Sequence, residues 1–148
     1  MLIRVQTGMR LTMMMERPVI FPDLDPGRVL ACRKTSGLSD ALQAYGEALL
    51  ECNVPCMEAS ESALEVVRAL KRHHAGIGIR ELGGDRFSLS CGPVRLVLEG
   101  SGEGSVHLVF TPGNAGIDVS DFGPADVARF IRAVFASRDR IEGLGFTN

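Results

Sequence analysis

The stretch FSLSCGPVRLVLEGSGEGSVHLVF, residues 87–110, decides the fold. Apolar side chains occupy alternate positions in three short runs, which are separated by Gly92-Pro93 and by the glycine-rich residues 100–104. A period of two is the repeat of a β-strand with one buried face. Connections of this length are typical of hairpins and are too short for the crossovers that parallel strands need. The three strands are therefore predicted to pair antiparallel.

The same alternation continues on both sides of this stretch. It includes Ile77 and Ile79 before the stretch and Ile117 and Val119 after it, with further connections at residues 83–85 and 112–116. The pattern predicts an antiparallel meander of about five strands. The remaining positions of these strands form the opposite face of the sheet, and they include Arg80, Ser88, Ser90, Arg95, Val97, Glu99, His107, Val109 and Thr111.

Two valines interrupt the polar character of this opposite face. Val97 and Val109 are expected on adjacent strands, on a face that an antiparallel sheet can leave in contact with water. We expect either the N-terminal segment or a second copy of the chain to cover them. An apolar spot with charged neighbours suits a dimer or ligand surface. The predicted interface residues are Val97, Val109, Arg95 and His107.

A first helix is predicted from an N-cap at Ser39 to a C-terminal end near Cys52 or Asn53. Its end is expected there because Pro55 disfavours helical backbone at the residue before it. The apolar stripe recurs at steps of three or four residues, as in a helix with one buried face. The stripe comprises Leu38, Leu42, Tyr45 and Leu49.

Two further helices carry recognisable end signals. Ser62 followed by Glu65 is a capping box, and basic residues 71–74 with Gly76 beyond them mark the end of that helix. The last helix is predicted to begin at Pro124, which suits the first helical position, and to continue through Ile141. Gly143 and Gly145 are expected to close it.

These elements predict an α+β fold, in which a five-stranded antiparallel β-meander has two helices before it and one C-terminal helix, all packed on one face. Residues 1–35 are predicted to be an N-terminal arm with short extended segments, and residues 36–148 a single α+β domain. Within the arm, Asp25-Pro26-Gly27 is a turn signal. Met13-Met14-Met15 is an alternative to Met1 as the start of translation.

The charge and aromatic content of the chain disfavour some classes of binding partner. The 148 residues carry 16 basic and 18 acidic side chains, for a net charge of -2. This balance disfavours nucleic acid as a partner, and one Tyr, seven Phe and no Trp provide few rings for stacking bases. No apolar run is long enough to span a membrane, and no secretion signal is evident. The cytoplasm is the expected location, with reduced cysteines.

Cys52, Cys56, His73 and His74 are the candidate metal ligands. Structural zinc takes four sulfur or nitrogen ligands, usually from compact knuckles. The spacing here matches no standard zinc motif, and an antiparallel pair of helices would separate the cysteines from the histidines. The competing interpretation is that Cys52 and Cys56 are small buried side chains and that the histidines act as charges at a helix C-terminus.

His107 and Arg95 are the candidate catalytic residues. His107 is expected within a strand on the outer face, where it could act as acid or base while Arg95 orients an anionic substrate. No nucleophile-elbow motif accompanies them. The loop at residues 100–104 joins two strands, whereas a phosphate cradle joins a strand to a helix, so this loop is interpreted as a hairpin tip.

The favoured hypothesis is a non-enzymatic binding or regulatory module that self-associates as a homodimer. Two alternatives stay open: a thiol or metal-site protein that uses Cys52 and Cys56, and a small enzyme with His107 as its acid or base. No cofactor is predicted, and zinc belongs to the first alternative alone. The sequence identifies no small-molecule ligand.

Overall fold

The computed structural model describes residues 24–31, 33–35, 37–52, 60–74, 76–92, 94–101, 104–110 and 115–146. A single sheet has five strands in chain order, each antiparallel to the next. The predicted meander is therefore confirmed. The strands are β1 (Gly78–Glu81), β2 (Arg86–Cys91), β3 (Val94–Gly100), β4 (Val106–Phe110) and β5 (Ala115–Asp118).

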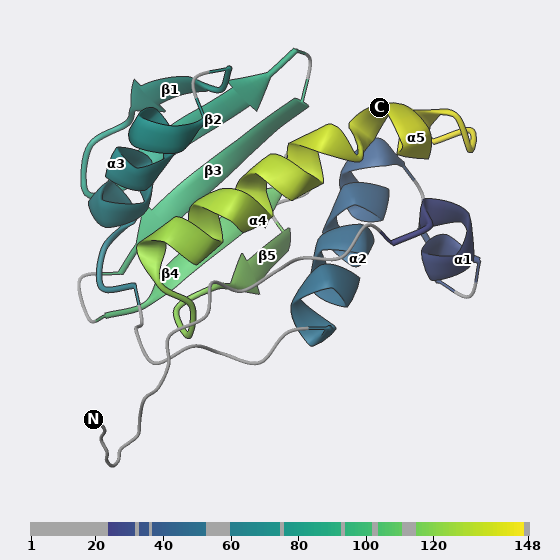
Figure 1. Ribbon diagram of the computed structural model, residues 1–148, viewed down its shortest axis with the longest axis horizontal. Helices are drawn as coiled ribbons and strands as arrows, with labels where there is room; N and C mark the ends of the chain where they lie inside the picture. Colours follow the sequence, from purple (N-terminus) through teal and green to yellow (C-terminus); the bar gives the residue numbers. More distant parts are fainter. Residues whose placement is uncertain are drawn as a thin grey trace, which may run out of the picture.

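The helices lie on one side of this sheet, as predicted (Figure 1). The long helix α4 crosses the sheet between α2 and α3 and contacts both. Because α4 lies between them, α2 and α3 do not form a hairpin, although they follow one another in the sequence. The helices are α1 (Pro26–Leu30), α2 (Leu38–Glu51), α3 (Ala63–His73), α4 (Pro124–Ala136) and α5 (Arg138–Glu142).

Helix α3 begins as the sequence predicts and ends slightly differently. The Ser62 hydroxyl accepts a hydrogen bond from the Glu65 amide, and the Glu65 side chain accepts one from the Ser62 amide, so the capping box is present. The C-cap is His74, whose amide donates to the Leu70 carbonyl. Gly76 therefore lies two residues beyond the cap, one position later than the C′ position where glycine usually ends a helix.

Helix α2 starts earlier than predicted. Its N-cap is Gly37, with extended backbone, and the Gly37 carbonyl accepts the first helical hydrogen bond from the Ala41 amide at 2.9 Å. Ser39 consequently lies in the first turn and is not the cap. The predicted C-terminal end is confirmed, because the helix stops at Glu51 with Cys52 as its C-cap.

The C-terminal helix is interrupted at Ser137, where continuous helix was predicted through Ile141. The buried Ser137 hydroxyl donates to the Val134 carbonyl at 2.7 Å. A serine that bonds a carbonyl of the preceding turn competes with the regular helical pattern and often bends the helix. Helix α5 therefore starts afresh at Arg138, and Ile141 is still fully buried.

Helix α1 lies in the region that was predicted to be an extended arm. The Asp25 side chain accepts a hydrogen bond from the Gly27 amide at 3.0 Å, and Pro26 follows as the first helical residue. The predicted turn is thus the first turn of a short helix, because an Asp cap and a Pro at N1 favour both structures. The extended segments predicted at residues 1–23 lie outside the described residues.

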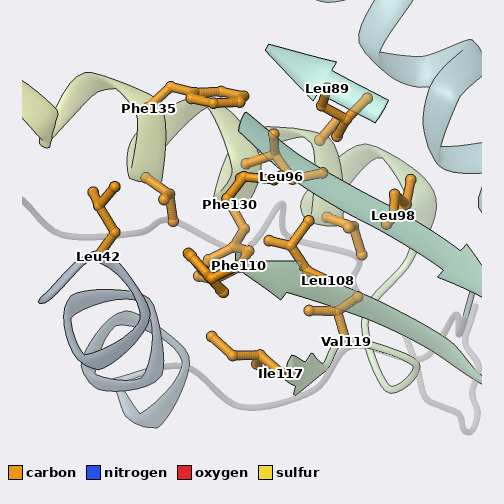
Figure 2. Close-up of a cluster of buried hydrophobic side chains, with 14 of the residues drawn as sticks. Leu42, Leu89, Leu96, Leu98, Leu108, Phe110, Ile117, Val119, Phe130 and Phe135 are labelled. Carbon is orange, nitrogen blue, oxygen red and sulfur yellow. The ribbon is translucent and has the colours of Figure 1, made fainter. Parts of the chain in front are cut away.

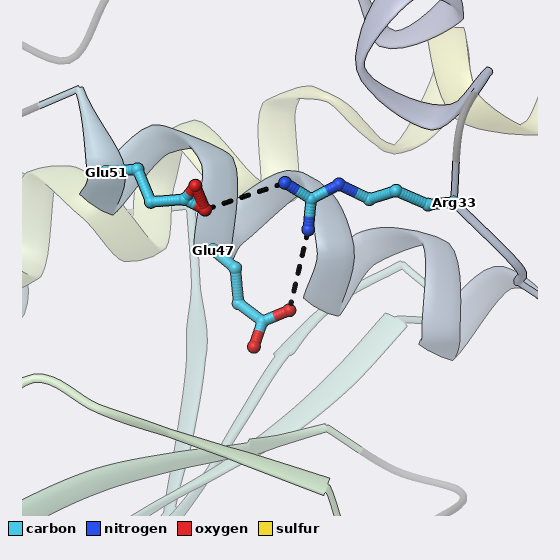
Figure 3. A network of polar contacts seen from close by, with 3 residues as sticks. All are labelled: Arg33, Glu47 and Glu51. Atoms are coloured by element: carbon cyan, nitrogen blue, oxygen red, sulfur yellow. Dashed lines mark ion pairs between the residues drawn. The ribbon is translucent and has the colours of Figure 1, made fainter.

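Polar contacts attach α1 and its following residues to α2. The Tyr45 hydroxyl, on α2, donates to the Leu24 carbonyl at 2.8 Å. The Arg33 guanidinium lies 3.9 Å from the Glu47 carboxylate and 3.5 Å from the Glu51 carboxylate (Figure 3). All three charged side chains are partly exposed, so these ion pairs contribute at most about 1 kcal/mol each.

The core fills the space between the helices and the inner face of the sheet (Figure 2). Alternate residues of the strands point into it, as the period of two requires. Within the described residues, no helix has the length and apolar character needed to cross a membrane. The largest fully buried side chains are Tyr45, Phe110, Phe130, Leu38, Leu49, Leu70, Leu89, Leu96, Leu98, Leu108, Ile131 and Ile141.

Candidate functional site

The open face of the sheet, on the side opposite the helices, carries the predicted interface residues. The strand register places Val97 directly beside Val109 on adjacent strands. Ser88 of β2 and Gly116 of β5 extend this row on either side. Both valines are only half-buried, whereas the residues that alternate with them on β3 and β4 are buried. The two valines therefore form an apolar centre on this face.

A row of ionisable side chains runs beside the valines. Its members are cross-strand neighbours in the order Arg86, Glu99, His107 and Asp118. The Arg86 Nε lies 3.5 Å from the Glu99 carboxylate. Opposite charges on neighbouring strands stabilise a sheet modestly, by about 0.2–1 kcal/mol per pair. This row has a structural explanation, and it also gives the open face a defined charge pattern.

Asp118 is engaged by Ser120 in the turn after β5. The Ser120 amide donates to Asp118 Oδ1 at 2.9 Å, and the Ser120 hydroxyl donates to the same atom. Burial alone would raise the pKa of this carboxyl group, but the two Ser120 hydrogen bonds and the nearby His107 outweigh it, and the pKa is lowered. Asp118 is therefore ionised at neutral pH and is held by Ser120.

The two candidate catalytic residues lie in different rows of the open face. Arg95 and Glu99 are four positions apart on β3, and His107 pairs with Glu99. Arg95 is therefore about 13 Å along the strand from the row of His107. The Val97–Val109 row lies between them. The acid/base role of His107 stays a prediction, but the register does not place Arg95 beside it.

Three of the four candidate metal ligands lie in the described residues, at the ends of two helices. Cys52 is the exposed C-cap of α2, so the interpretation of Cys52 as a buried side chain is wrong. Cys56 lies outside the described residues. His73 and His74 end α3, with ring centroids 6.3 Å apart. In the described part of the chain, no group of three or more His, Cys, Asp or Glu residues could hold a metal ion.

The environment of His74 reveals a feature that was not predicted. Burial lowers the pKa of His74, and the charges of Arg132, His73 and Arg129 lower it further, in that order. Arg129 and Arg132 belong to α4, more than fifty positions later in the sequence. The end of α3 therefore shares a positive environment with the middle of α4. Nothing in the sequence indicates this contact, because it depends on how the two helices pack.

A shallow hollow of about 480 Å³ lies between α1 and α5. Its one basic side chain, Arg140, contacts the Tyr45 hydroxyl at 3.3 Å and the Leu24 carbonyl at 3.5 Å. These contacts attach the N-terminal residues to the C-terminal helix, so Arg140 has a structural role. The lining residues are Asp25, Pro26, Gly27, Arg140, Gly143 and Leu144.

Comparison with known proteins assigns no function, because no family model, no curated protein and no solved structure matches the chain. The open sheet face and the basic environment of His74 are consequently argued from their own chemistry.

Proposed function

We propose that this protein is a non-enzymatic binding or regulatory module that self-associates as a homodimer through the open face of its sheet. The observation that carries the proposal is the pairing of Val97 with Val109 at the centre of that face. No helix in the described part of the chain covers this side of the sheet (Figure 1). Apolar side chains at the centre of a polar face are typical of a contact surface.

The occupant of the face is a second copy of this chain, because the charges along β3 are self-complementary. Arg95, Val97 and Glu99 occupy successive positions on the same face of the strand. A twofold axis across the strand at Val97 brings Arg95 opposite the partner subunit's Glu99. The same axis brings Val97 against the partner subunit's Val97. Such an arrangement is the requirement for an isologous dimer.

The size of the face sets the strength of the proposed dimer. Five strands about 4.8 Å apart, each presenting about five residues of 3.4 Å, give a plan area of roughly 400 Å². A standard interface buries about 800 Å² on each partner. The proposed interface is smaller, and it is more polar than a typical obligate interface. Association should therefore be reversible and in the micromolar range.

Two features of the structure support a non-enzymatic role in the cytoplasm. Arg95 lies two rows from His107, and Asp118 is held by Ser120, so these groups do not converge on one reacting atom. Cys52 and Cys91 are exposed and unpaired. Exposed free thiols are typical of a reducing compartment.

Sedimentation velocity of the full chain from low to high micromolar concentration tests the proposal. The native protein is expected to pass from monomer to dimer. Arg95→Glu and Glu99→Arg should each weaken the dimer, because each places like charges opposite one another. A mixture of the two variants should form a heterodimer, because its charges are again complementary. This rescue separates an interface effect from misfolding.

Two outcomes would overturn the proposal. One is a native protein that stays monomeric throughout the range. The other is a dimer that responds to neither charge reversal, which would place the contact elsewhere. If the chain dimerises only after residues 1–23 are deleted, the N-terminal segment covers the face, and self-association is not the function of the native chain.

A further inference from the structure

The exposed surfaces of α3 and α4 form a basic face on the side of the molecule opposite the open sheet face. The two helices pack against one another over the sheet (Figure 1). On both helices the exposed positions recur at steps of three or four residues, and the buried positions between them face the core. We name this surface the basic helical face. It comprises Arg68, Lys71, Arg72, His73, His74, Arg129 and Arg132.

The positive charge of this face is largely uncompensated. Arg129 pairs with Asp126. The other four Arg and Lys side chains of the face form no ion pair with the described residues. Glu65, the nearest acid on the α3 sequence, is occupied by the amides of Glu61 and Ser62 at 2.8 and 3.2 Å. Burial is the largest cause of the lowered pKa of His74, and the charges of Arg132, His73 and Arg129 lower it further.

Most acidic side chains of the described residues lie outside α3 and α4, which carry only Glu65 and Asp126. Helix α2 carries Asp40, Glu47 and Glu51 and no basic residue, whereas on α5 Asp139 and Glu142 are balanced by Arg138 and Arg140. In Figure 1, α3 lies at the opposite end of the helical layer from α1 and α5. The net charge of -2 therefore does not describe the surface of α3 and α4, where five Arg and Lys side chains outnumber Glu65 and Asp126. Local potential, and not net charge, determines which partner is attracted.

We propose that the basic helical face binds the phosphate backbone of double-stranded nucleic acid without reading its sequence. Four of its seven side chains are guanidinium groups, which match phosphate oxygens in geometry and in charge. Arg68 and Arg72 are one helical turn apart, about 6 Å, so both reach the same side of the helix. This proposal differs from the expectation that net charge alone supports, because it rests on where the charges lie.

The chemistry of the face favours a duplex backbone over other polyanions. The aromatic side chains of the two helices other than histidine, Phe130 and Phe135, are buried, so none can stack on unpaired bases. The exposed apolar side chains are Leu64, Ala125 and Ala136, which are too small a set to insert into a membrane. The face also lacks the aromatic anchors that carry the binding energy of most protein contacts.

The number of cations predicts how binding depends on salt. Each phosphate neutralised on duplex DNA contributes about -0.9 to the slope of log K against log salt concentration. Four or five permanent cations then give a slope of roughly -4. Affinity should resemble that of non-specific binders, with a dissociation constant of about 10⁻⁴ to 10⁻⁶ M at physiological salt.

Fluorescence anisotropy of labelled random-sequence duplex DNA and RNA, titrated with the full chain at several salt concentrations, tests the proposal. The test variant is Arg68→Glu with Arg132→Glu. The matched control is Arg28→Glu with Lys34→Glu, which changes the net charge equally at exposed positions on and after α1. The test variant should lose at least tenfold in affinity and reduce the slope by about 2, whereas the control should lose no more than about threefold.

Thermal unfolding of both variants verifies that each is folded. Absence of duplex binding by the native chain at low salt would overturn the proposal, as would equal losses in the two variants. Binding to polyglutamate or to anionic vesicles without binding to either duplex would also overturn it, because the partner would then be an acidic protein or a lipid surface. The test is independent of the proposed dimer, because the two surfaces lie on opposite sides of the sheet.

Discussion

The carboxylate of Asp85 occupies the space where a side chain at Gly100 would lie. From this position it accepts hydrogen bonds from the amides of Ala63 and Leu64, at 2.9 and 3.0 Å, in the first turn of α3. The Asp85 carbonyl also accepts one from the Gly100 amide at 2.9 Å. The turn between β1 and β2 therefore caps a helix in the other layer, and Gly100 provides the room for it.

Replacing Asp85 should weaken the attachment of α3 to the sheet. Asp85→Ala removes both cap acceptors and should lower the free energy of unfolding by about 1–2 kcal/mol. Asp85 has φ of 59°, which Asn also tolerates. Asp85→Asn retains one oxygen acceptor and should lose less than Asp85→Ala. Urea denaturation measures both, and an alanine variant as stable as the native chain would show that these hydrogen bonds contribute nothing.

Replacing Gly100 by alanine provides a sharper test, because the sign of the change in stability is itself predicted. Alanine in place of glycine within a strand ordinarily stabilises a protein by about 0.5–1 kcal/mol. At Gly100 the new Cβ would collide with the Asp85 carboxylate and lie 3.1 Å from the Ala63 amide nitrogen, so Gly100→Ala should instead destabilise by more than about 1 kcal/mol. The control is Gly116→Ala in β5, whose Cβ would meet neighbours at 3.6 and 3.7 Å.

A double-mutant cycle identifies the cause of the Gly100 effect. If the collision with Asp85 dominates, Gly100→Ala should cost less in the Asp85→Ala background, since the carboxylate is then absent. Equal costs in both backgrounds would contradict this explanation and assign the loss to the backbone around Ala63.

Features that depend on neighbouring residues were predictable from the sequence. The meander followed from a period of two and short glycine connections, and the capping box of Ser62 and Glu65 followed from their spacing. The cap from Asp85 was not predictable, because it joins residues 22 positions apart. The break at Ser137 was missed for a different reason: a serine within an apolar helix can point outward or bond the preceding turn, and only packing decides.

The two candidate surfaces also differ in how far the sequence predicts them. The open sheet face was visible in the sequence, because alternation assigns Val97 and Val109 to one side and short hairpins make their strands adjacent. The basic helical face was not visible in the sequence, because it forms only when α3 packs beside α4. A net charge near zero concealed it further. Summed charge describes no surface unless the fold is known.

Asp118 should titrate below the ordinary range of an aspartate, and Ser120→Ala should raise its pKa. Burial opposes ionisation here, so the lowered pKa depends on the hydrogen bonds from the Ser120 hydroxyl and amide and on His107. A lowered pKa in the folded state contributes stability that is present above about pH 4 and is lost as pH falls further. Carboxyl NMR titration of both proteins measures the shift. An unchanged pKa in the variant would assign the effect to the Ser120 amide and His107.

His74 should titrate below the ordinary pKa of histidine, and Arg132→Gln should raise that pKa. Burial is the largest cause of the lowered value, and the charge of Arg132 is the largest electrostatic cause, ahead of His73 and Arg129. Because the unfolded chain then takes up a proton more readily than the folded one, stability should fall as pH decreases below about 6.5. Arg132→Gln should reduce this loss.

Histidine NMR titration measures the pKa of His74 directly, with Arg28→Gln on α1 as a control that leaves it unchanged. A pKa that does not move in Arg132→Gln would show that the charge of Arg132 does not act on His74. Duplex nucleic acid bound on the basic helical face should raise the pKa of His74, because phosphate charge favours the protonated ring. A titration in the presence of duplex that leaves the pKa of His74 unchanged would place any bound phosphate away from this end of α3.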